Sequence, residues 1–588
     1  MARRGSTIIL TLLGVIVLCS VAMFVAVILL VGRGPSVPSN ATLTLRLGGD
    51  LAETSPDNVV GYLSGTRTPI VRAIVDNLRK AKVDRRVATV LLKETGFTTP
   101  YWGKIQEIRD AILDFKKSGK PIYAYLEYGG DRDYYLATAA DKVFMLPSSP
   151  LDLTGVATYE LFFRGTLDKI GAYPDIHRIG DYKTAANTFT EKTMTRAHRE
   201  MDESLNRALY DQIVAGIAAG RNKPDAEVRA LIDDGPFLAD QAKRLGLIDD
   251  VAYEDQVEEK LQPGSNKKRV NGEEYATVAT SSVGLDRGPR IAVIYASGAI
   301  VGGESGFDPL NGSVLGSDTL IEYIRQARRD SSIRAIVLRI DSPGGSAAAS
   351  DAIWRELMIA KQERANRPIV ASMSDLAASG GYYIAMPADA IVAQPATLTG
   401  SIGIFGGKFI TGGAYEKLGM HIESTSIGKH AEMNSPVRPY NESELKKITE
   451  QLDEFYQQFV ERAAESRHST PEKIDRLAQG RVWTGSQARE NGLVDELGGL
   501  DQAIAVAKAR ANIDAGSSVE IVPFPGRKSF FQIMSEQLTR SEERSMAGFL
   551  AAANLSSAER QALRALRGPL SLFRRGELLA LMPMAFLQ

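Results

Sequence analysis

The feature that most limits what this chain can fold into is an internal duplication with an offset of 246 to 248 residues. Four sequence blocks recur in the same order at that offset. The pairs are residues 89–94 with 336–341, 121–122 and 134–141 with 368–369 and 382–389, 179–180 with 427–428, and 241–249 with 487–495. Chance could produce one such block but not four in order. Because 588 residues exceed a single hydrophobic core, we expect two copies of one domain.

Each copy alternates short β-rich runs with helical stretches, which predicts an α/β fold with parallel strands. The runs lack polar alternation, as expected for a sheet covered on both faces. They are residues 88–92, 122–126, 291–295, 335–340 and 369–373, with helical stretches at 104–117 and 348–364. We predict an N-terminal repeat at 41–260, a linker at 261–289, a C-terminal repeat at 290–514 and a helical tail at 515–588, with helices near 529–539 and 556–567.

The N-terminus predicts a membrane anchor. Residues 7–31 are almost wholly apolar, and about 20 such residues span a bilayer as a helix. A cleavable signal peptide has a shorter apolar core of about 7–15 residues, and Ala41 comes late for a cleavage site. We therefore expect a retained transmembrane helix at 6–32 after a short cytoplasmic end at 1–5. Arg3 and Arg4 favour an exported body, although Arg33 partly offsets them.

Composition excludes several classes of function. A net charge of −1 gives no support for nucleic-acid binding, which usually requires a basic face. The single cysteine, Cys19, excludes an intrachain disulfide and a cysteine metal cluster. The five histidines show no close pairing, so we expect no metal site and no cofactor.

The two copies differ where chemistry would be expected. The second contains Ala-Ala-Ser-Gly-Gly-Tyr at 377–382, a turn of small residues between a strand and a helix. Such a turn can expose the Ser379 hydroxyl as a nucleophile and direct the Gly380 N–H at a developing oxyanion. The bland alternative is a helix-capping serine. The first copy has Asp131 at the equivalent position.

A second loop, Asp-Ser-Pro-Gly-Gly-Ser at 341–346, also belongs to the second copy alone. The N–H groups of Gly344 and Gly345 at a strand–helix junction can approach a bound carbonyl or anion. A simple glycine turn is the alternative, and a nucleotide is disfavoured because the phosphate-loop motif is absent. The first copy has Glu-Thr-Gly-Phe at this place.

The third difference is reversed, because Lys183 of the first copy aligns with Ala431 of the second. Most lysines are solvated, but this reciprocal pattern predicts one composite site built from both copies. Lysine acts as a general base only where burial lowers its pKa from about 10.4 towards 7–8. An interface between the repeats could provide that burial.

These residues resemble the signal peptide peptidase A family in its long, tandem-repeat, membrane-anchored form. The resemblance covers roughly residues 40–510 plus the anchor, and it rests on the motifs at 180–184, 341–345, 377–382 and 398–403. It implies two crotonase/Clp-protease-like repeats and a Ser/Lys dyad that degrades cleaved signal peptides. Carried across, Ser379 is the nucleophile, Lys183 the base, and Ser401 the hydroxyl that orients the lysine. Gly380 and either Gly344 or Gly345 are then the oxyanion donors.

The resemblance also implies a setting for the protein. The family forms ring- or bowl-shaped homo-oligomers, and we expect a tetramer. We expect a single-pass protein of the bacterial inner membrane, with its catalytic body in the periplasm. Its partners are peptide substrates and the membrane, with no nucleic acid. Whether Ser379 and Lys183 pair within one chain or between chains stays open at this point.

Three alternatives remain from the sequence. A Ser-His peptidase could pair Ser379 with His421 or His430. An acyl-CoA enzyme of crotonase type would use the paired glycine N–H groups without the serine. A membrane scaffold without catalysis would need neither.

Overall fold

The computed structural model describes residues 37–54, 69–264, 268–308, 312–364, 366–526, 577–583 and 586–587. The predicted anchor at 6–32 and the predicted tail helices at 529–539 and 556–567 lie outside these described residues. Within the described ranges, no helix is both long enough and apolar enough to cross a bilayer.

The first repeat is built on a six-stranded parallel sheet in the order β10-β5-β3-β2-β1-β11. Its strands are β1 (Ala41–Gly49), β2 (Val87–Phe97), β3 (Ile122–Leu126), β5 (Lys142–Met145), β10 (Asp250–Val251) and β11 (Arg269–Asn271). Parallel strands need crossover connections, and helices such as α3 (Val71–Val83) and α4 (Gly103–Lys116) supply them.

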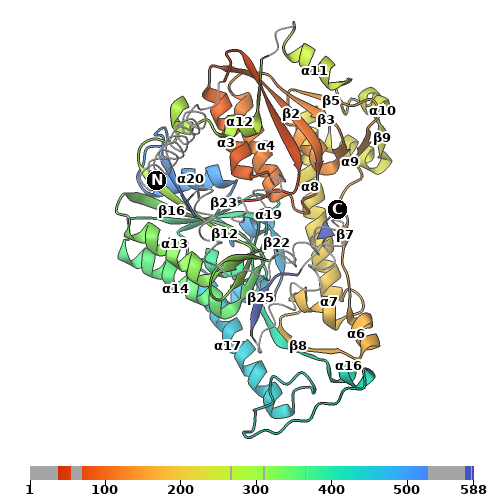
Figure 1. The fold of residues 1–588 in the computed structure, drawn as a ribbon, viewed down its shortest axis with the longest axis vertical. Coiled ribbons are helices and arrows are strands. Elements are labelled where there is room, and N and C mark those ends of the chain that lie inside the picture. The colour runs from red at the N-terminus through yellow and green to blue at the C-terminus, as the bar shows by residue number, and fades with distance from the viewer. Residues whose placement is uncertain are drawn as a thin grey trace, which may run out of the picture.

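The second repeat reproduces this strand order as β23-β19-β18-β16-β12-β24, again with every pair parallel. The strands are β12 (Arg290–Ser297), β16 (Ile333–Ser342), β18 (Ile369–Ala378), β19 (Ala390–Ala393), β23 (Glu496–Leu497) and β24 (Glu520–Phe524). Every residue of β18 is buried, as expected for a strand covered on both faces of the sheet. The predicted α/β duplication is confirmed (Figure 1).

Two edge strands lie outside the predicted repeat boundaries. β11 falls in the segment predicted as a linker, and β24 falls in the segment predicted as a helical tail. Each pairs with the first strand of its own repeat and completes the sheet. The described residues of the tail hold three strands, β24, β25 (Leu579–Leu581) and β26 (Phe586–Leu587), and no helix.

Buried ion pairs join the two repeats. Arg339 on β16 is fully buried and lies 2.8 Å from Glu53 and 2.7 Å from Glu107, both of the first repeat. Beside them, the Lys104 Nζ of α4 lies 2.7 Å from Asp341 and 3.2 Å from Asp375. Removing one partner from such a cluster is costly because it leaves a buried charge unpaired. The cluster therefore fixes α4 of the first repeat against β16 and β18 of the second.

An arm of the first repeat, defined here as residues 160–183, also crosses onto the second. It carries α6 (Arg164–Ile170) and β8 (Tyr173–Ile179), which lie beside the second repeat in the lower half of Figure 1. β8 pairs antiparallel with β21 (Ile404–Ile410), from Tyr173 opposite Ile410 to Ile179 opposite Ile404. Because Lys183 follows β8 by four residues, this pairing carries the lysine into the second repeat.

The arm completes a seven-stranded sheet in the order β14-β15-β13-β17-β25-β21-β8. The strands not yet given are β13 (Ala299–Val301), β14 (Gly306–Asp308), β15 (Gly312–Gly316) and β17 (Gly344–Ser346). Three parts of the chain far apart in sequence thus meet in one sheet: the arm, the glycine loop of the second repeat, and the C-terminal strand β25.

Candidate active site

Ser379 occupies a sharp turn between β18 and α15 (Gly380–Ala385). Its φ of 56° and ψ of −114° lie outside the usual regions, a strain typical of functional turns. The backbone holds this geometry, because the Ser379 N–H donates to Gly400 O at 2.8 Å. The turn also requires small neighbours, since a Cβ on Gly381 would lie 2.6 Å from Ser342 O. The tight turn of small residues that the sequence motif predicts is present, but the Ser379 side chain is buried here and not exposed.

Lys183 reaches the serine through a passage lined by glycines. A Cβ on Gly480 would lie 2.4 Å from Lys183 Cα, and one on Gly403 would lie 3.2 Å from Lys183 Cδ. The side chain ends with Nζ 2.7 Å from Ser379 Oγ. Nζ also lies 3.1 Å from Ser401 Oγ and 3.0 Å from Ser401 O. The structure therefore brings Ser379, Lys183 and Ser401 together within one chain.

The surroundings of Lys183 favour its neutral form. Its side chain is fully buried, and burial lowers its pKa well below the usual value of 10.5. Lys104 is also a buried lysine, but its pKa is shifted in the opposite direction. Burial acts on it in the same direction, but Asp341 and Asp375 outweigh that effect and raise the Lys104 pKa. A buried lysine without a carboxylate partner can accept a proton at a pH where Lys104 cannot.

The three glycines predicted as oxyanion donors are not equivalent. Gly380 opens α15, so its N–H belongs to the first turn, where the helix itself offers no acceptor. The Gly344 N–H lies 3.2 Å from Ser342 Oγ, which accepts its hydrogen bond. Gly345 faces the C-terminal strand β25, with Ala580 opposite it. Gly380 and Gly345 are therefore the donors that the geometry favours.

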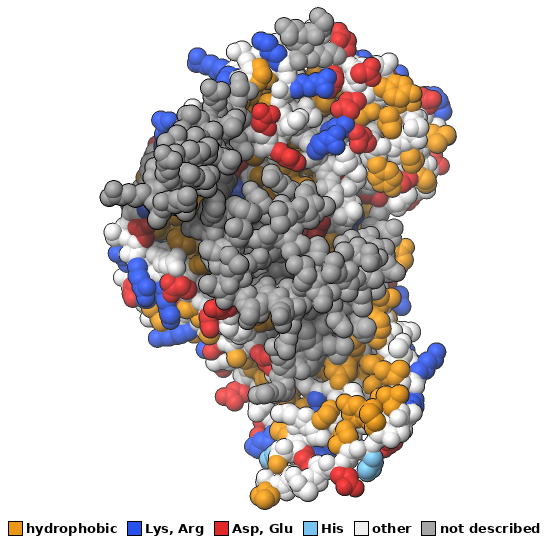
Figure 2. Space-filling model, viewed as in Figure 1, with side chains coloured by type: hydrophobic (Ala, Val, Ile, Leu, Met, Phe, Trp, Pro, Cys, Tyr) orange, Lys and Arg blue, Asp and Glu red, His pale blue; other side chains and the backbone are white. Residues whose placement is uncertain are grey.

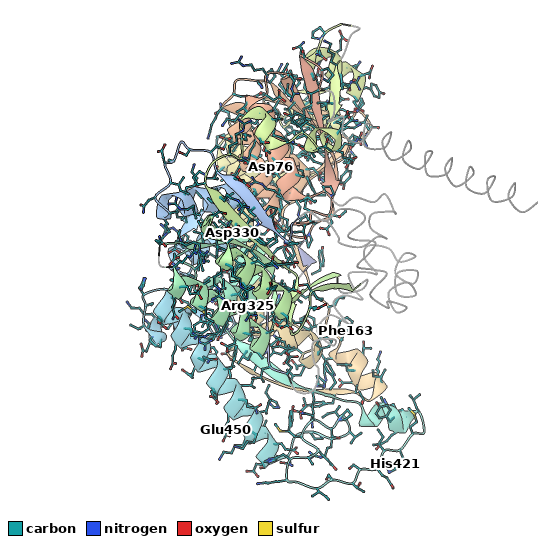
Figure 3. All side chains as sticks on the ribbon, turned by 60° about the vertical axis from the view of Figure 1, so that its left-hand side comes forward. Asp76, Phe163, Arg325, Asp330, His421 and Glu450 are labelled. Atoms are coloured by element: carbon teal, nitrogen blue, oxygen red, sulfur yellow. The ribbon has the colours of Figure 1, made fainter. Side chains whose placement is uncertain are left out.

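Neither histidine of the Ser-His alternative lies at the serine. His430 Nε2 lies 2.8 Å from Ser443 Oγ. His421 is exposed, at the lower end of the molecule in Figure 3. The geometry favours a Ser–Lys pair over a Ser–His pair.

In the opposite repeat, Asp131 stands at the position of Ser379 and Ala431 at the position of Lys183, and both make structural contacts. Asp131 accepts hydrogen bonds at 3.1 Å from the N–H groups of Thr154 and Gly155. The Ala431 N–H donates to Gly428 O at 3.2 Å, as the Lys183 N–H does to Gly180 O at 3.3 Å. The backbone turn is retained in both copies, but each copy keeps only part of the chemistry.

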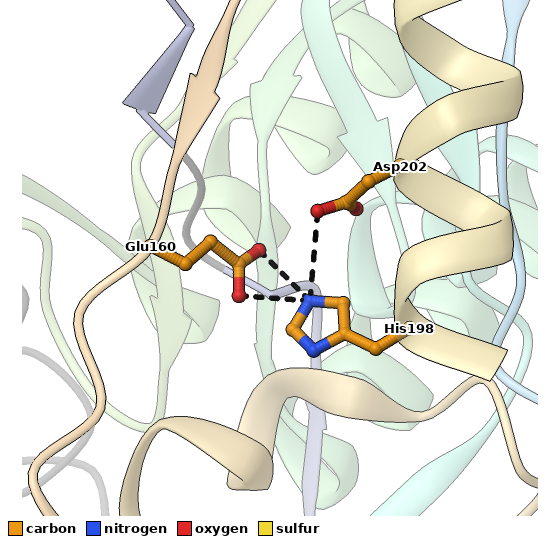
Figure 4. Close-up of side chains that lie close together, drawn as sticks. All are labelled: Glu160, His198 and Asp202. Carbon is orange, nitrogen blue, oxygen red and sulfur yellow. Dashed lines mark hydrogen bonds and ion pairs between the residues drawn. The ribbon is translucent and has the colours of Figure 1, made fainter. Parts of the chain in front are cut away.

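One group of the described residues has the spacing of metal ligands: Glu160, His198 and Asp202, whose ligand atoms all lie within 4.8 Å of one another. His198 and Asp202 lie one turn apart on α8 (Arg196–Arg221) and face Glu160 from the arm (Figure 4). His198 Nε2 is 2.8 Å from Glu160 and 3.9 Å from Asp202. Burial and then the Glu160 charge raise the pKa of Asp202 to about 7. A buried histidine–carboxylate pair accounts for these contacts, so we assign no metal.

The sequence analysis gives no role to Gly403, although this glycine ends the 398–403 motif, and it does not identify Gly480. Both are needed because Lys183 passes against their Cα atoms. Nothing in one sequence separates Gly480 from an ordinary turn glycine, because its role depends on a contact with a residue almost 300 positions away.

Comparisons with known proteins show what the chain is similar to. The model of peptidase family S49 matches residues 114–268 and 361–514, once in each repeat. The chain is 38% identical to the chloroplastic serine protease SPPA of Arabidopsis thaliana, covering 83% of this chain and 71% of that protein. It is 37% identical to Protease 4 of Salmonella typhi, covering 75% and 72%, and 30% identical to Protease 4 of Haemophilus influenzae, covering 83% and 82%.

Proposed function

The chain belongs to peptidase family S49, the family of signal peptide peptidase A, and from that premise we propose that it is a Ser/Lys endopeptidase acting on short apolar peptides. The observation that carries the proposal is the Lys183 Nζ to Ser379 Oγ distance of 2.7 Å, with a buried lysine that has no carboxylate partner among the described residues. Acyl-CoA chemistry would not need this pair, and a scaffold would not need the strained serine.

The proposed reaction is acyl transfer in two steps. Neutral Lys183 accepts the proton of the Ser379 hydroxyl, and Oγ attacks the peptide carbonyl. The oxyanion is stabilised by the N–H groups of Gly380 and Gly345. Protonated Lys183 then donates its proton to the leaving amine. Lysine, neutral again, activates a water that hydrolyses the acyl-enzyme. Ser401 orients the amine throughout, and no cofactor is required.

The substrates we propose are cleaved signal peptides and similar extended apolar peptides. Apolar side chains border the dyad, with Ala185, Ala186 and Phe405 in one cluster and Met201, Leu376 and Leu398 in another. An extended peptide next to β17 could place alternate side chains against these surfaces.

Membrane attachment through residues 6–32, with the body in the periplasm, is part of the proposal and rests on the apolar N-terminal run. Deleting residues 1–34 is expected to move the protein from the membrane fraction to the soluble fraction with activity retained. An insoluble product would count against a simple anchor.

A homo-oligomer, with a tetramer as the expected size, is also proposed. Exposed apolar side chains gather at the lower end of the molecule (Figure 2). They come from the arm and from the segment after α16 (Gly412–Lys417), and include Ile170, Tyr173, Leu418, Met420 and Ile422. Contiguous apolar surface of this kind favours a protein contact. Sedimentation of the 35–588 protein tests this, and a monomer at micromolar concentration would refute it.

The function is tested with kcat/KM for a small peptide amide between about pH 6 and 10. Activity should rise with pH through the Lys183 pKa and then level off, because only neutral lysine reacts. Lys183→Ala and Ser379→Ala should each abolish hydrolysis, and the double variant should be no worse, since the two act as one unit. His430→Ala is the matched control and should retain activity. An inactive His430→Ala beside an active Lys183→Ala would overturn the proposal.

A further inference from the structure

The C-terminal strand β25 fills the position beside the catalytic serine that an extended peptide would take. It lies between β17 and β21 and is antiparallel to both. Backbone hydrogen bonds fix its register on both sides of the loop: Met582 N–H donates to Pro343 O at 2.8 Å, and Ala347 N–H donates to Leu578 O at 3.1 Å. This is strand addition to an open sheet edge, as in peptide recognition.

The register places one particular carbonyl at the candidate oxyanion donors. Hydrogen-bonded pairs alternate along an antiparallel ladder. With bonds at Pro343–Met582 and Ala347–Leu578, the bonded pair between them is Gly345–Ala580. Ala580 O is also close to the helix N-terminus after Ser379. A Cβ built on Gly344 would lie 2.1 Å from Ala580 O and 2.7 Å from Gly380 N, so both atoms border the same point.

The side chains of this segment alternate between two surfaces, as those of a bound strand do. Leu579 and Leu581 pack with Ala185, Ala186 and Phe405 next to the dyad. Ala580 points the other way into the core of the second repeat. Met582 then joins the cluster around Met201 and Leu398, and with Pro583 it lines the pocket that Asp202 borders. The segment thus uses the apolar surfaces that we propose for substrates.

We propose that residues 577–583 of this chain are an internal peptide ligand of its own active site, bound in the direction of a substrate with Ala580 at the position whose carbonyl is attacked. This rests on the proposed function of the site. Leu579, Ala580 and Leu581 are at most 1% exposed, and Ser379 and Lys183 are fully buried with the segment in place. A peptide in solution can reach Ser379 only after the segment leaves. The C-terminus is therefore a competitive inhibitor carried by the enzyme.

The size of the effect follows from tethering. A segment held on the same chain has an effective concentration on the order of 1 mM. If the free seven-residue peptide binds with a Kd of about 0.1 mM, the tether weakens the apparent affinity for other peptides about tenfold. The effect should fall on KM, because the chemical groups are unchanged once the segment has left.

The experiment compares two substitutions at one position of the full chain. Ala580→Trp cannot fit at a fully buried alanine, so it should expel the segment and lower KM for a small peptide amide about tenfold at similar kcat. Ala580→Gly fits the same space and should keep the wild-type KM. Adding the free peptide Glu-Leu-Leu-Ala-Leu-Met-Pro should restore inhibition to the Ala580→Trp chain, competitively with substrate. The same peptide with tryptophan at its alanine should not inhibit.

Equal KM values for the folded wild-type and Ala580→Trp chains would overturn the proposal. A second variant, Leu579→Asn with Leu581→Asn, covers the case in which Ala580→Trp fails to fold. If both variants unfold, the strand is an integral part of the fold and the proposal is wrong. Binding of the labelled peptide to Ser379→Ala chains separates this inference from the proposed function. If the labelled peptide binds more tightly to the Ser379→Ala/Ala580→Trp chain than to the Ser379→Ala chain, the ligand role is supported even if no variant hydrolyses peptides. If it binds equally to both chains, the ligand role is refuted even if the wild-type chain hydrolyses peptides.

Discussion

Replacing Lys183 by methionine should stabilise the folded protein, although it destroys the proposed base. Methionine fills a similar volume and brings no charge into the buried site. The lysine must lose its proton, or remain charged without a counter-ion, when the chain folds. The expected sign is therefore opposite to that of most substitutions at buried positions.

The magnitude is best expressed as a slope against pH. The Lys183 pKa is about 10.5 in the unfolded chain and well below that in the folded chain. Between these values the unfolded state binds one more proton, so wild-type stability rises with pH by about 1.4 kcal/mol per pH unit. Methionine binds no proton. The advantage of Lys183→Met should thus be largest below the folded pKa and should decrease at that slope until about pH 10.5.

Lys104→Met is the matched control, since Lys104 is also buried but lies between Asp341 and Asp375. Its folded pKa is raised above the unfolded value, so its contribution is fully present below the unfolded pKa. Lys104→Met should cost about 3–5 kcal/mol, because two buried carboxylates lose their cation. That cost should be constant from pH 7 to 10. Urea unfolding of the three chains measures both differences. A Lys183→Met chain that is less stable by a pH-independent amount would refute the argument for a neutral lysine.

Three further outcomes follow from particular contacts. Ser401→Ala removes the 3.1 Å hydroxyl contact of Lys183 but leaves the 3.0 Å carbonyl contact, so kcat/KM should fall about 3- to 10-fold with the alkaline rise retained; an unchanged rate would exclude the orienting role. Gly480→Ala places a methyl group 2.4 Å from the Lys183 backbone and should lower kcat about 100-fold, whereas Gly492→Ala, at a similar φ with open space, should not. Arg339→Met leaves Glu53 and Glu107 without their cation and should lower the free energy of unfolding in urea by about 3–5 kcal/mol. Arg290→Met, which breaks the partly exposed pair with Asp330, should lower it by less than about 1 kcal/mol.

The fold was largely predictable because the duplication acts as an alignment within one sequence. The predicted runs at 122–126, 335–340 and 369–373 lie inside β3, β16 and β18, since buried parallel strands are continuous apolar segments. The edge strands β11 and β24 were missed, because a few residues paired on one side carry too short a pattern. Sequence alone points to the two residues of the proposed dyad, Ser379 and Lys183, because each occurs in one copy only.

What could not be predicted depends on contacts between distant parts of the chain. Gly480 is needed only because Lys183 passes it, and Gly345 is distinguished from Gly344 only by the Ser342 hydroxyl and the strand opposite. Strand β25 has an apolar sequence that equally suits a packed tail helix, which is how the segment was interpreted. The residues with which it pairs lie more than 170 positions away, and sequence pattern alone does not identify them.

Dividing the site between two repeats accounts for the burial that a lysine needs to act as the proposed base. A lysine next to Ser379 on the surface of the second repeat would be solvated, and its pKa would stay near 10.4. Here the arm of the first repeat, held by β8 on β21, delivers Lys183 into the interior of the second. Desolvation is then the largest influence on its pKa, and the carboxylates of the interface are already paired with Lys104 and Arg339. Among the described residues, the interface carboxylates pair with Lys104 and Arg339 and not with Lys183. The interface that assembles the site therefore also favours the neutral form of the proposed base.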